Sequence, residues 1–162
     1  MTSVRALGHP VHPMLVVFPL GLLITATIFD LIDVAGGSNG FGQAAFYMIG
    51  AGVIGAALAA LTGLIDWIGL ASNTRAKRVG LLHAGCNTMV LLLFLFVWLY
   101  RWGQPEYRVG AGGLVVELLA VAIGGVAAWL GGELVQRLGV GVDDNAHPDA
   151  PSSLSGRPVR AR

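Results

Sequence analysis

Four long apolar runs are the feature of this sequence that most constrains its fold. They extend from about residue 14 to 32, 43 to 70, 79 to 100 and 112 to 134. Each run holds about 19 to 28 residues, enough for a helix to cross a hydrocarbon core of about 30 Å. Charged residues make up only 12% of the chain, whereas about a quarter of the residues of a soluble domain are charged. The sequence therefore predicts an all-α integral membrane protein, a four-helix bundle with up-down-up-down topology.

The chain divides into two parts by composition. Residues 1–142 contain all four apolar runs and are predicted to form one transmembrane domain. From Asp143 to residue 162 the sequence is polar and rich in proline and serine. A segment of this kind buries too little apolar surface to fold, and it is predicted to be a disordered cytoplasmic tail.

Basic residues are divided unevenly between the two predicted membrane surfaces. One side carries eight of them: Arg5, Arg75, Lys77, Arg78, Arg137, Arg157, Arg160 and Arg162. The other side carries only Arg101 and Arg108. Because basic loops stay in the cytoplasm, this bias predicts that both termini are cytoplasmic. The net charge is only +1, which gives no electrostatic reason to expect nucleic acid as a partner. The four apolar runs make the lipid bilayer the expected partner.

Histidines open the first and third apolar runs. His9 and His12 lie in the segment His9-Pro10-Val11-His12-Pro13, in which Pro13 suits the first position of a helix and His12 is then expected near its N-cap. His83 lies inside the third run, and Asn87 follows one turn later on the same helix face. An ionisable residue within a membrane span indicates a functional site.

Two carboxylates are expected at the same level as these histidines. His12, Asp66, His83 and Glu133 all fall within about two turns of the predicted cytoplasmic edge. The imidazoles of His12 and His83 are predicted to be near enough to share a ligand. The order histidine then carboxylate occurs once in each helical hairpin, which suggests a parallel repeat about an axis normal to the membrane.

Charged residues at the opposite edge are expected to have structural roles. Asp30 and Asp33 are expected at the outer surface, where water or Arg101 can satisfy them. Glu117 lies about one turn inside the fourth run and is expected to have a structural partner there.

Several motifs together resemble a known family. They are His9-Pro10-Val11-His12-Pro13-Met14-Leu15, Phe18-Pro19-Leu20-Gly21-Leu22, Gly63-Leu64-Ile65-Asp66-Trp67, His83 with Asn87, and Trp129-Leu130-Gly131-Gly132-Glu133-Leu134-Val135. The chain resembles the bacterial membrane family called domain of unknown function 2231 over nearly all of residues 7–142. The resemblance implies a four-helix inner-membrane protein without an established reaction. Some relatives are joined to Rieske-type iron–sulfur domains, which suggests electron transfer and a redox partner.

A b-type haem is the first functional hypothesis. His83 with either His12 or His9 would supply the axial ligands, with Asn87 beside them. Arg75 and Arg78 stand near the same surface, where they could pair with the haem propionates or with the two carboxylates. A Rieske centre is excluded because it needs two cysteines, and Cys86 is the only one.

A divalent transition metal is the second hypothesis. Its ligands would be His9, His12, Asp66, His83 and Glu133, which supply the nitrogen and oxygen atoms that such metals bind. A third hypothesis is movement of protons or ions through the same residues.

A structural role is the remaining alternative. The same side chains could form a polar network that ties helix ends together in a subunit that binds a membrane-protein partner or forms an oligomer. The sequence has no arrangement of nucleophile and base, so the chain is not expected to be an enzyme.

Overall fold

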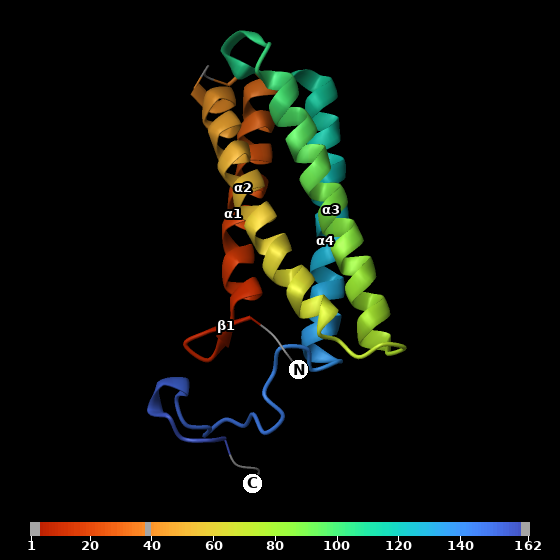
Figure 1. The fold of residues 1–162 in the computed structure, drawn as a ribbon. Helices are drawn as coiled ribbons and strands as arrows, with labels where there is room; N and C mark the ends of the chain where they lie inside the picture. Colours follow the sequence, from red (N-terminus) through yellow and green to blue (C-terminus); the bar gives the residue numbers. More distant parts are fainter. Residues whose placement is uncertain (1–3, 38–39, 160–162) are drawn as a thin grey trace.

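The computed structural model describes residues 4–37 and 40–159, so Arg160 and Arg162 of the charge prediction lie outside the described residues. Four long helices dominate it: α1 (Val11–Val34), α2 (Gly40–Ile68), α3 (Arg75–Arg101) and α4 (Gly110–Gln136) (Figure 1). The shorter elements are β1 (Arg5–Ala6), β2 (His9–Pro10), and the 3-10 helices η1 (Pro105–Tyr107) and η2 (Ser153–Ser155). All four long helices are long and apolar enough to span a membrane, which confirms the predicted fold class.

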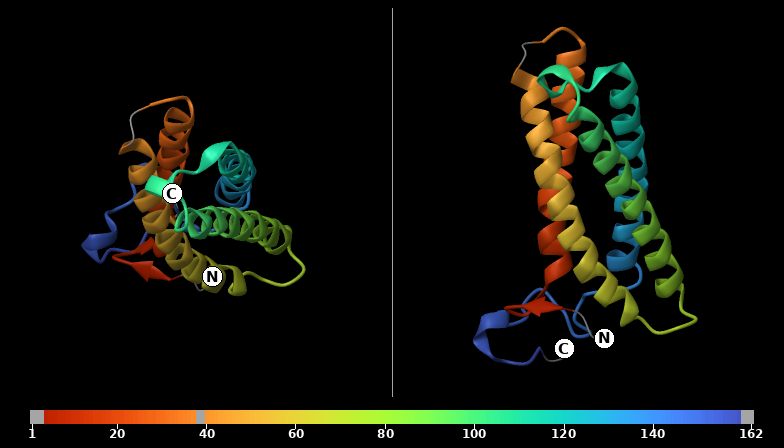
Figure 2. Two further views of the ribbon diagram at one scale, coloured as in Figure 1. Left: turned by 90° about the horizontal axis from the view of Figure 1, so that it is seen from above. Right: turned by 45° about the horizontal axis from the view of Figure 1, so that its top comes forward.

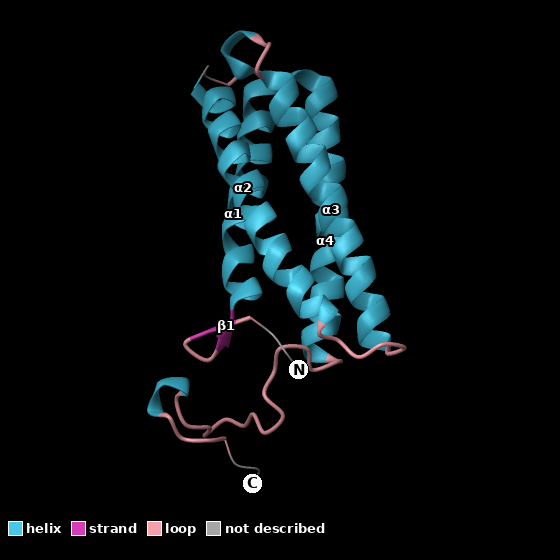
Figure 3. Cartoon of the chain, viewed as in Figure 1, coloured by secondary structure: helices cyan, strands magenta, loops and turns pink. Residues whose placement is uncertain are grey.

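The four helices are arranged as two antiparallel hairpins. Helix α1 packs along α2, and α3 packs along α4, while the hairpins meet mainly through α2 and α3 (Figure 2). Both ends of the chain and the α2–α3 connection lie at one end of the bundle, which we call the terminal end (Figure 3). The α1–α2 and α3–α4 connections lie at the opposite end, which we call the distal end.

Helix α1 begins earlier than the sequence predicts. Strands β1 and β2 pair in antiparallel fashion, and the Val11 amide donates to the Val4 carbonyl at 2.9 Å. This small hairpin holds Pro10 in extended conformation as the N-cap, so the helix starts at Val11. His12 lies near the N-cap, as predicted, but Pro13 is the third helical residue and not the first, so that part of the prediction is wrong.

Helix α3 also starts before its apolar run, because a polar cap stabilises its first turn. The Thr74 hydroxyl accepts a hydrogen bond from the Lys77 amide at 3.1 Å, which satisfies one of the unpaired amides of the helix start. Trp67 and Lys77 then connect α2 to α3: the indole donates to the Lys77 carbonyl at 3.0 Å, and the ammonium donates to the Trp67 carbonyl at 2.7 Å. These contacts set the position of α3, and of His83 about two turns further on.

Buried apolar side chains fill the centre of the bundle. The core cluster consists of Leu23, Ala26, Ala45, Ile49, Phe94 and Ala120. Small residues bring the helices close: a Cβ at Gly52 would lie 2.6 Å from the Leu23 side chain. This apolar layer separates the polar groups at the two ends of the bundle.

Candidate functional site: a histidine pair between the hairpins

The imidazoles of His12 and His83 are neighbours at the terminal end, as the sequence predicts. Their ring centres lie 6.4 Å apart, and the ring planes are 85° from parallel. His12 comes from α1 and His83 from α3, so this histidine pair joins the two hairpins.

Each imidazole is held by a backbone carbonyl of its own hairpin. Nδ1 of His12 lies 2.8 Å from the Ala59 carbonyl oxygen on α2, and Nδ1 of His83 lies 2.8 Å from the Ala127 carbonyl oxygen on α4. A carbonyl oxygen only accepts, so each Nδ1 carries the hydrogen. In the neutral ring, Nε2 is then the unprotonated nitrogen with an available lone pair.

A glycine in each hairpin makes room for the ring. A Cβ at Gly63 would lie 2.8 Å from Cε1 of His12, and a Cβ at Gly131 would lie 3.1 Å from Cε1 of His83. Each glycine follows the accepting alanine by four positions, one helical turn. The same arrangement of histidine, alanine carbonyl and glycine thus occurs in both hairpins and supports the predicted repeat.

Ala59 and Ala127 were not identified from the sequence. Every residue carries a backbone carbonyl, and a methyl side chain gives no sign that this carbonyl binds a histidine. The available signal was the pattern Ala-x-x-x-Gly, once on α2 and once on α4. That pattern is common in tightly packed membrane helices, so it would not have singled out these two sites.

Asn87 lies beside the pair, as its spacing predicts. Its side-chain nitrogen is 3.1 Å from Nε2 of His83 and donates to the His83 carbonyl at 2.9 Å. With Nδ1 of His83 bound to Ala127, the Asn87 amide is the donor to Nε2. The lone pair of His83 is therefore engaged within its own helix.

The other predicted ligands are engaged separately. Nε2 of His9 lies 3.4 Å from the Ser153 hydroxyl, and an Asp66 carboxylate oxygen accepts from the Val4 amide at 3.0 Å. Glu133 pairs with Arg75 at 2.6 Å, one of the pairings expected from the sequence.

The structure does not assemble the five predicted ligands into a single metal cluster. Within residues 4–37 and 40–159, no three His, Cys, Asp or Glu side chains gather closely enough to hold a metal ion. Glu133 is instead bound by Arg75, near the start of α3, about two turns before His83. Arg78 is exposed at the same end of the bundle.

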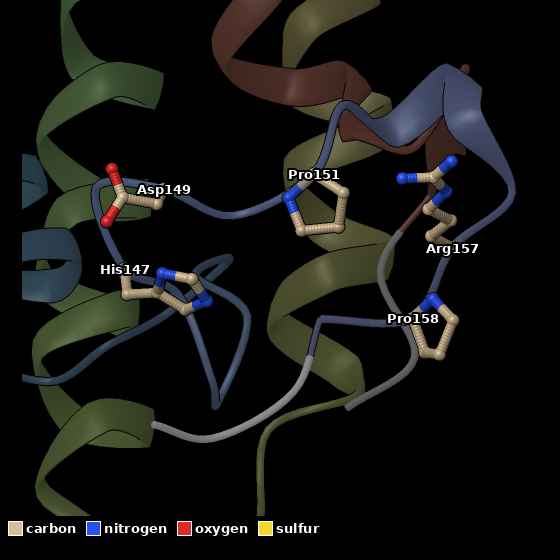
Figure 4. Close-up of a pocket in the computed structure, with 5 residues that line it drawn as sticks. All are labelled: His147, Asp149, Pro151, Arg157 and Pro158. Atoms are coloured by element: carbon tan, nitrogen blue, oxygen red, sulfur yellow. The ribbon is translucent and has the colours of Figure 1, made fainter.

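The fourth histidine, His147, belongs to the C-terminal tail. It lines a hollow of about 390 Å³ together with Asp149, Pro151, Arg157 and Pro158 (Figure 4). The hollow is formed by tail residues and does not include the histidine pair. The disorder predicted for the tail stays a prediction.

The distal end holds a second polar group, which we call the distal cluster: Asp30, Arg101 and Glu117. All three are fully buried. Arg101 binds both carboxylate oxygens of Asp30, at 2.6 and 2.7 Å. The sequence analysis anticipated Arg101 as a partner of Asp30, but placed Asp30 at the water-exposed edge. Packing of α1, α3 and α4 around the ion pair removes it from water.

The histidine pair and the distal cluster lie at the two ends of the apolar middle part of the bundle. Asp30 follows His12, and Arg101 follows His83, by eighteen positions, which corresponds to about 27 Å along a helix. That length is close to the hydrocarbon thickness of about 30 Å. The histidine pair and the distal cluster therefore lie near opposite faces of a membrane.

Four apolar helices with polar contacts gathered at their two ends define a multi-pass membrane protein. The chain belongs to the family described as predicted membrane protein (DUF2231), which matches residues 8–144. No curated protein and no solved structure matches it significantly.

Proposed function

We propose that this protein is a small inner-membrane redox module that holds a b-type haem between His12 and His83, with both termini in the cytoplasm. The observation that carries the proposal is the histidine pair itself. Two imidazoles from separate hairpins face a common region, and each is oriented through Nδ1 by a backbone carbonyl.

The spacing of the rings suits one metal between them. A metal–nitrogen distance of about 2.0–2.1 Å on each side, plus the radius of each ring, puts the ring centres about 6 Å apart. The observed separation is 6.4 Å. Metal-binding histidines characteristically donate their second ring N–H to a carbonyl or carboxylate, which fixes the ring and raises its basicity. Ala59 and Ala127 provide that second partner.

The number of ligands favours haem over a bare divalent ion. A structural or catalytic zinc needs at least three protein ligands, and no group of three candidates is present in the described ranges 4–37 and 40–159. A haem brings four nitrogens in its own plane and needs only the two axial ones from the protein. When bound, it would supply one-electron chemistry. Arg75, half-exposed at the same end, is suited to pair with its propionates.

The orientation follows from the basic residues once the buried one is set aside. Arg101 lies inside the distal cluster, which leaves Arg108 as the only basic residue of the described chain in the distal connections. The excess at the terminal end supports cytoplasmic termini.

One observation favours a second candidate, a structural subunit. The Asn87 amide donates to Nε2 of His83, the atom that a metal would require. In that case the histidines serve as hydrogen-bonding ties between helices, each contributing about 0.6 kcal/mol and at most about 2.

Absorption spectra distinguish these candidates. The full-length protein, expressed with haem precursor and purified in detergent, should show a Soret band that sharpens on dithionite reduction. His12→Ala and His83→Ala should lose the band. The matched controls His9→Ala and His147→Ala should keep it, because those two histidines lie outside the pair. A featureless spectrum with stoichiometric bound metal would support the divalent ion, and a featureless spectrum without metal would support the structural subunit.

A further inference from the structure

The distal cluster contains two carboxyl groups and one guanidinium, all three buried away from water. Asp30, Arg101 and Glu117 come from α1, α3 and α4, and each has a fully buried side chain. With both carboxylates ionised, the cluster would carry one uncompensated negative charge inside the bundle. Burial of an unpaired charge is strongly unfavourable, and such a group is neutralised or paired.

Arg101 carries a single positive charge, so it cannot neutralise two carboxylates. Four of its five N–H groups are also already engaged by other acceptors. Nε donates to the Tyr107 carbonyl at 2.6 Å, and the terminal nitrogens donate to both oxygens of Asp30 and to the Gly42 carbonyl. Only one N–H remains for Glu117, at a long 3.5 Å. Asp30 therefore holds the guanidinium, and Glu117 has a weak contact only.

The Glu117 carboxyl lies beside a second carboxyl group, and one of its two oxygens lacks a donor. An oxygen of Glu117 and an oxygen of Asp30 both lie against Nη1 of Arg101, at 3.5 and 2.6 Å, so the two carboxyl groups are adjacent. The Oε2 atom of Glu117 is buried and receives no hydrogen bond from the described part of the chain. Two ionised carboxylates can only accept, so a bond between them requires a proton on one of them.

We propose that Glu117 carries a proton and donates a hydrogen bond through it to the Asp30 carboxylate, which makes the distal cluster a proton-binding site with no net charge. The proposal does not rest on haem binding at the other end of the bundle. Asp30 remains the ionised partner because Arg101 engages both of its oxygens.

Other charged groups near the cluster do not remove the need for this proton. Asp33, on α1, is bound by Arg108 at 3.1 Å, so that pair balances itself. Helix α2 contributes the Gly42 carbonyl, and the α3–α4 connection contributes the Tyr107 carbonyl, both already bound to Arg101. Arg101 and Arg108 are the cations of this end among the described residues.

Infrared spectroscopy at neutral pH tests the proposal on the full-length protein in a maltoside detergent, which has no carbonyl group. A carboxylic-acid C=O stretch should be present and should shift when glutamate is labelled with carbon-13 at its side-chain carboxyl. The chain has three glutamates: Glu106, Glu117 and Glu133. Glu106→Gln and Glu133→Gln should keep the band, and Glu117→Gln should lose it. If Glu117→Gln fails to fold, the label and the two control variants still assign the band by elimination.

Three results would overturn the proposal. One is absence of the carboxylic-acid band in the folded wild-type protein. Another is a band that shifts with labelled aspartate instead of labelled glutamate. The third is a thermal midpoint that rises in sodium chloride relative to choline chloride, with the increase lost in Glu117→Gln, because a metal cation would then balance an ionised Glu117.

Discussion

Asp30 and Arg101 occupy equivalent positions in the two hairpins and bind each other across the bundle. They are 71 positions apart in the chain, the same separation as between His12 and His83. Residues at equivalent positions of a two-fold repeat can touch only where both lie near its axis. Two such contacts occur between α1 and α3: His12 with His83 at the terminal end, and Asp30 with Arg101 at the distal end. The axis of the repeat therefore lies between these two helices.

Breaking the buried ion pair should strongly destabilise the bundle. In Arg101→Met the Asp30 carboxylate loses its partner, which should lower the free energy of unfolding by about 3–5 kcal/mol, as for other buried pairs. Asp30→Asn should cost less, because Glu117 lies on the same guanidinium and can ionise to replace the lost counter-charge. Unfolding in mixed detergent and dodecyl sulfate micelles measures this.

A matched control and a compensating variant complete that experiment. Arg75→Gln breaks the Arg75–Glu133 pair, whose arginine side chain is 53% exposed, and should cost less than about 1 kcal/mol. Replacing Asp30, Arg101 and Glu117 together by Leu, Met and Leu removes all buried charge and should recover most of the lost stability. A triple variant as unstable as Arg101→Met would contradict this account.

The glycines beside the imidazoles should not tolerate a methyl group. In Gly63→Ala the new Cβ would lie 2.8 Å from the His12 ring, and in Gly131→Ala it would lie 3.1 Å from the His83 ring. Gly132 has no atom within 4 Å of its ideal Cβ, so Gly132→Ala should be neutral or stabilise the helix by up to about 1 kcal/mol. Thermal midpoints should therefore rank Gly63→Ala below Gly131→Ala, and both below Gly132→Ala. Equal midpoints would contradict the close packing of the rings.

Removing the amide of Asn87 separates the two proposed functions. Asn87→Leu frees Nε2 of His83, so it should increase the fraction of protein that retains haem, measured by the Soret band per mole of chain. Thr88→Val, at the exposed neighbouring position, serves as the control. If Asn87→Leu instead lowers the thermal midpoint and no variant shows a Soret band, the histidine pair is a structural tie.

Cysteine labelling tests the orientation. In a Cys86→Ala background, Ser72→Cys lies in the α2–α3 connection and Gly103→Cys lies in the α3–α4 connection; both positions are exposed. A membrane-impermeant maleimide added outside intact cells with a permeable outer layer should label position 103 and leave position 72 unlabelled until the inner membrane is opened. The reverse pattern would show that the termini face outward.

The predicted spans differ from the helices by at most four residues at any end, because hydropathy sums along the chain and needs no knowledge of tertiary contacts. The differences arise where polar residues extend a helix. Arg75 to Arg78 join α3 through the Thr74 cap, and His12 joins α1 after the β1–β2 hairpin. The predicted spans place His12 and His83 at the same depth, near the terminal end of the bundle. Their proximity could therefore be predicted from the sequence.

The partners of the polar side chains were less predictable. Asp66 was expected beside the histidines, yet it binds the backbone of Val4. Glu117 was expected to have a structural partner, but the burial of the whole distal cluster depends on how three helices close around it.

The sequence alone thus determined that this chain crosses a membrane four times, and which residues lie near each end of the bundle. Both follow from the length and polarity of consecutive segments. The tertiary structure decided which side chains meet: His12 with Ala59, His83 with Ala127, and Asp30 with Arg101. Those contacts depend on the rotation of each helix about its axis, which is set by packing between residues far apart in the chain.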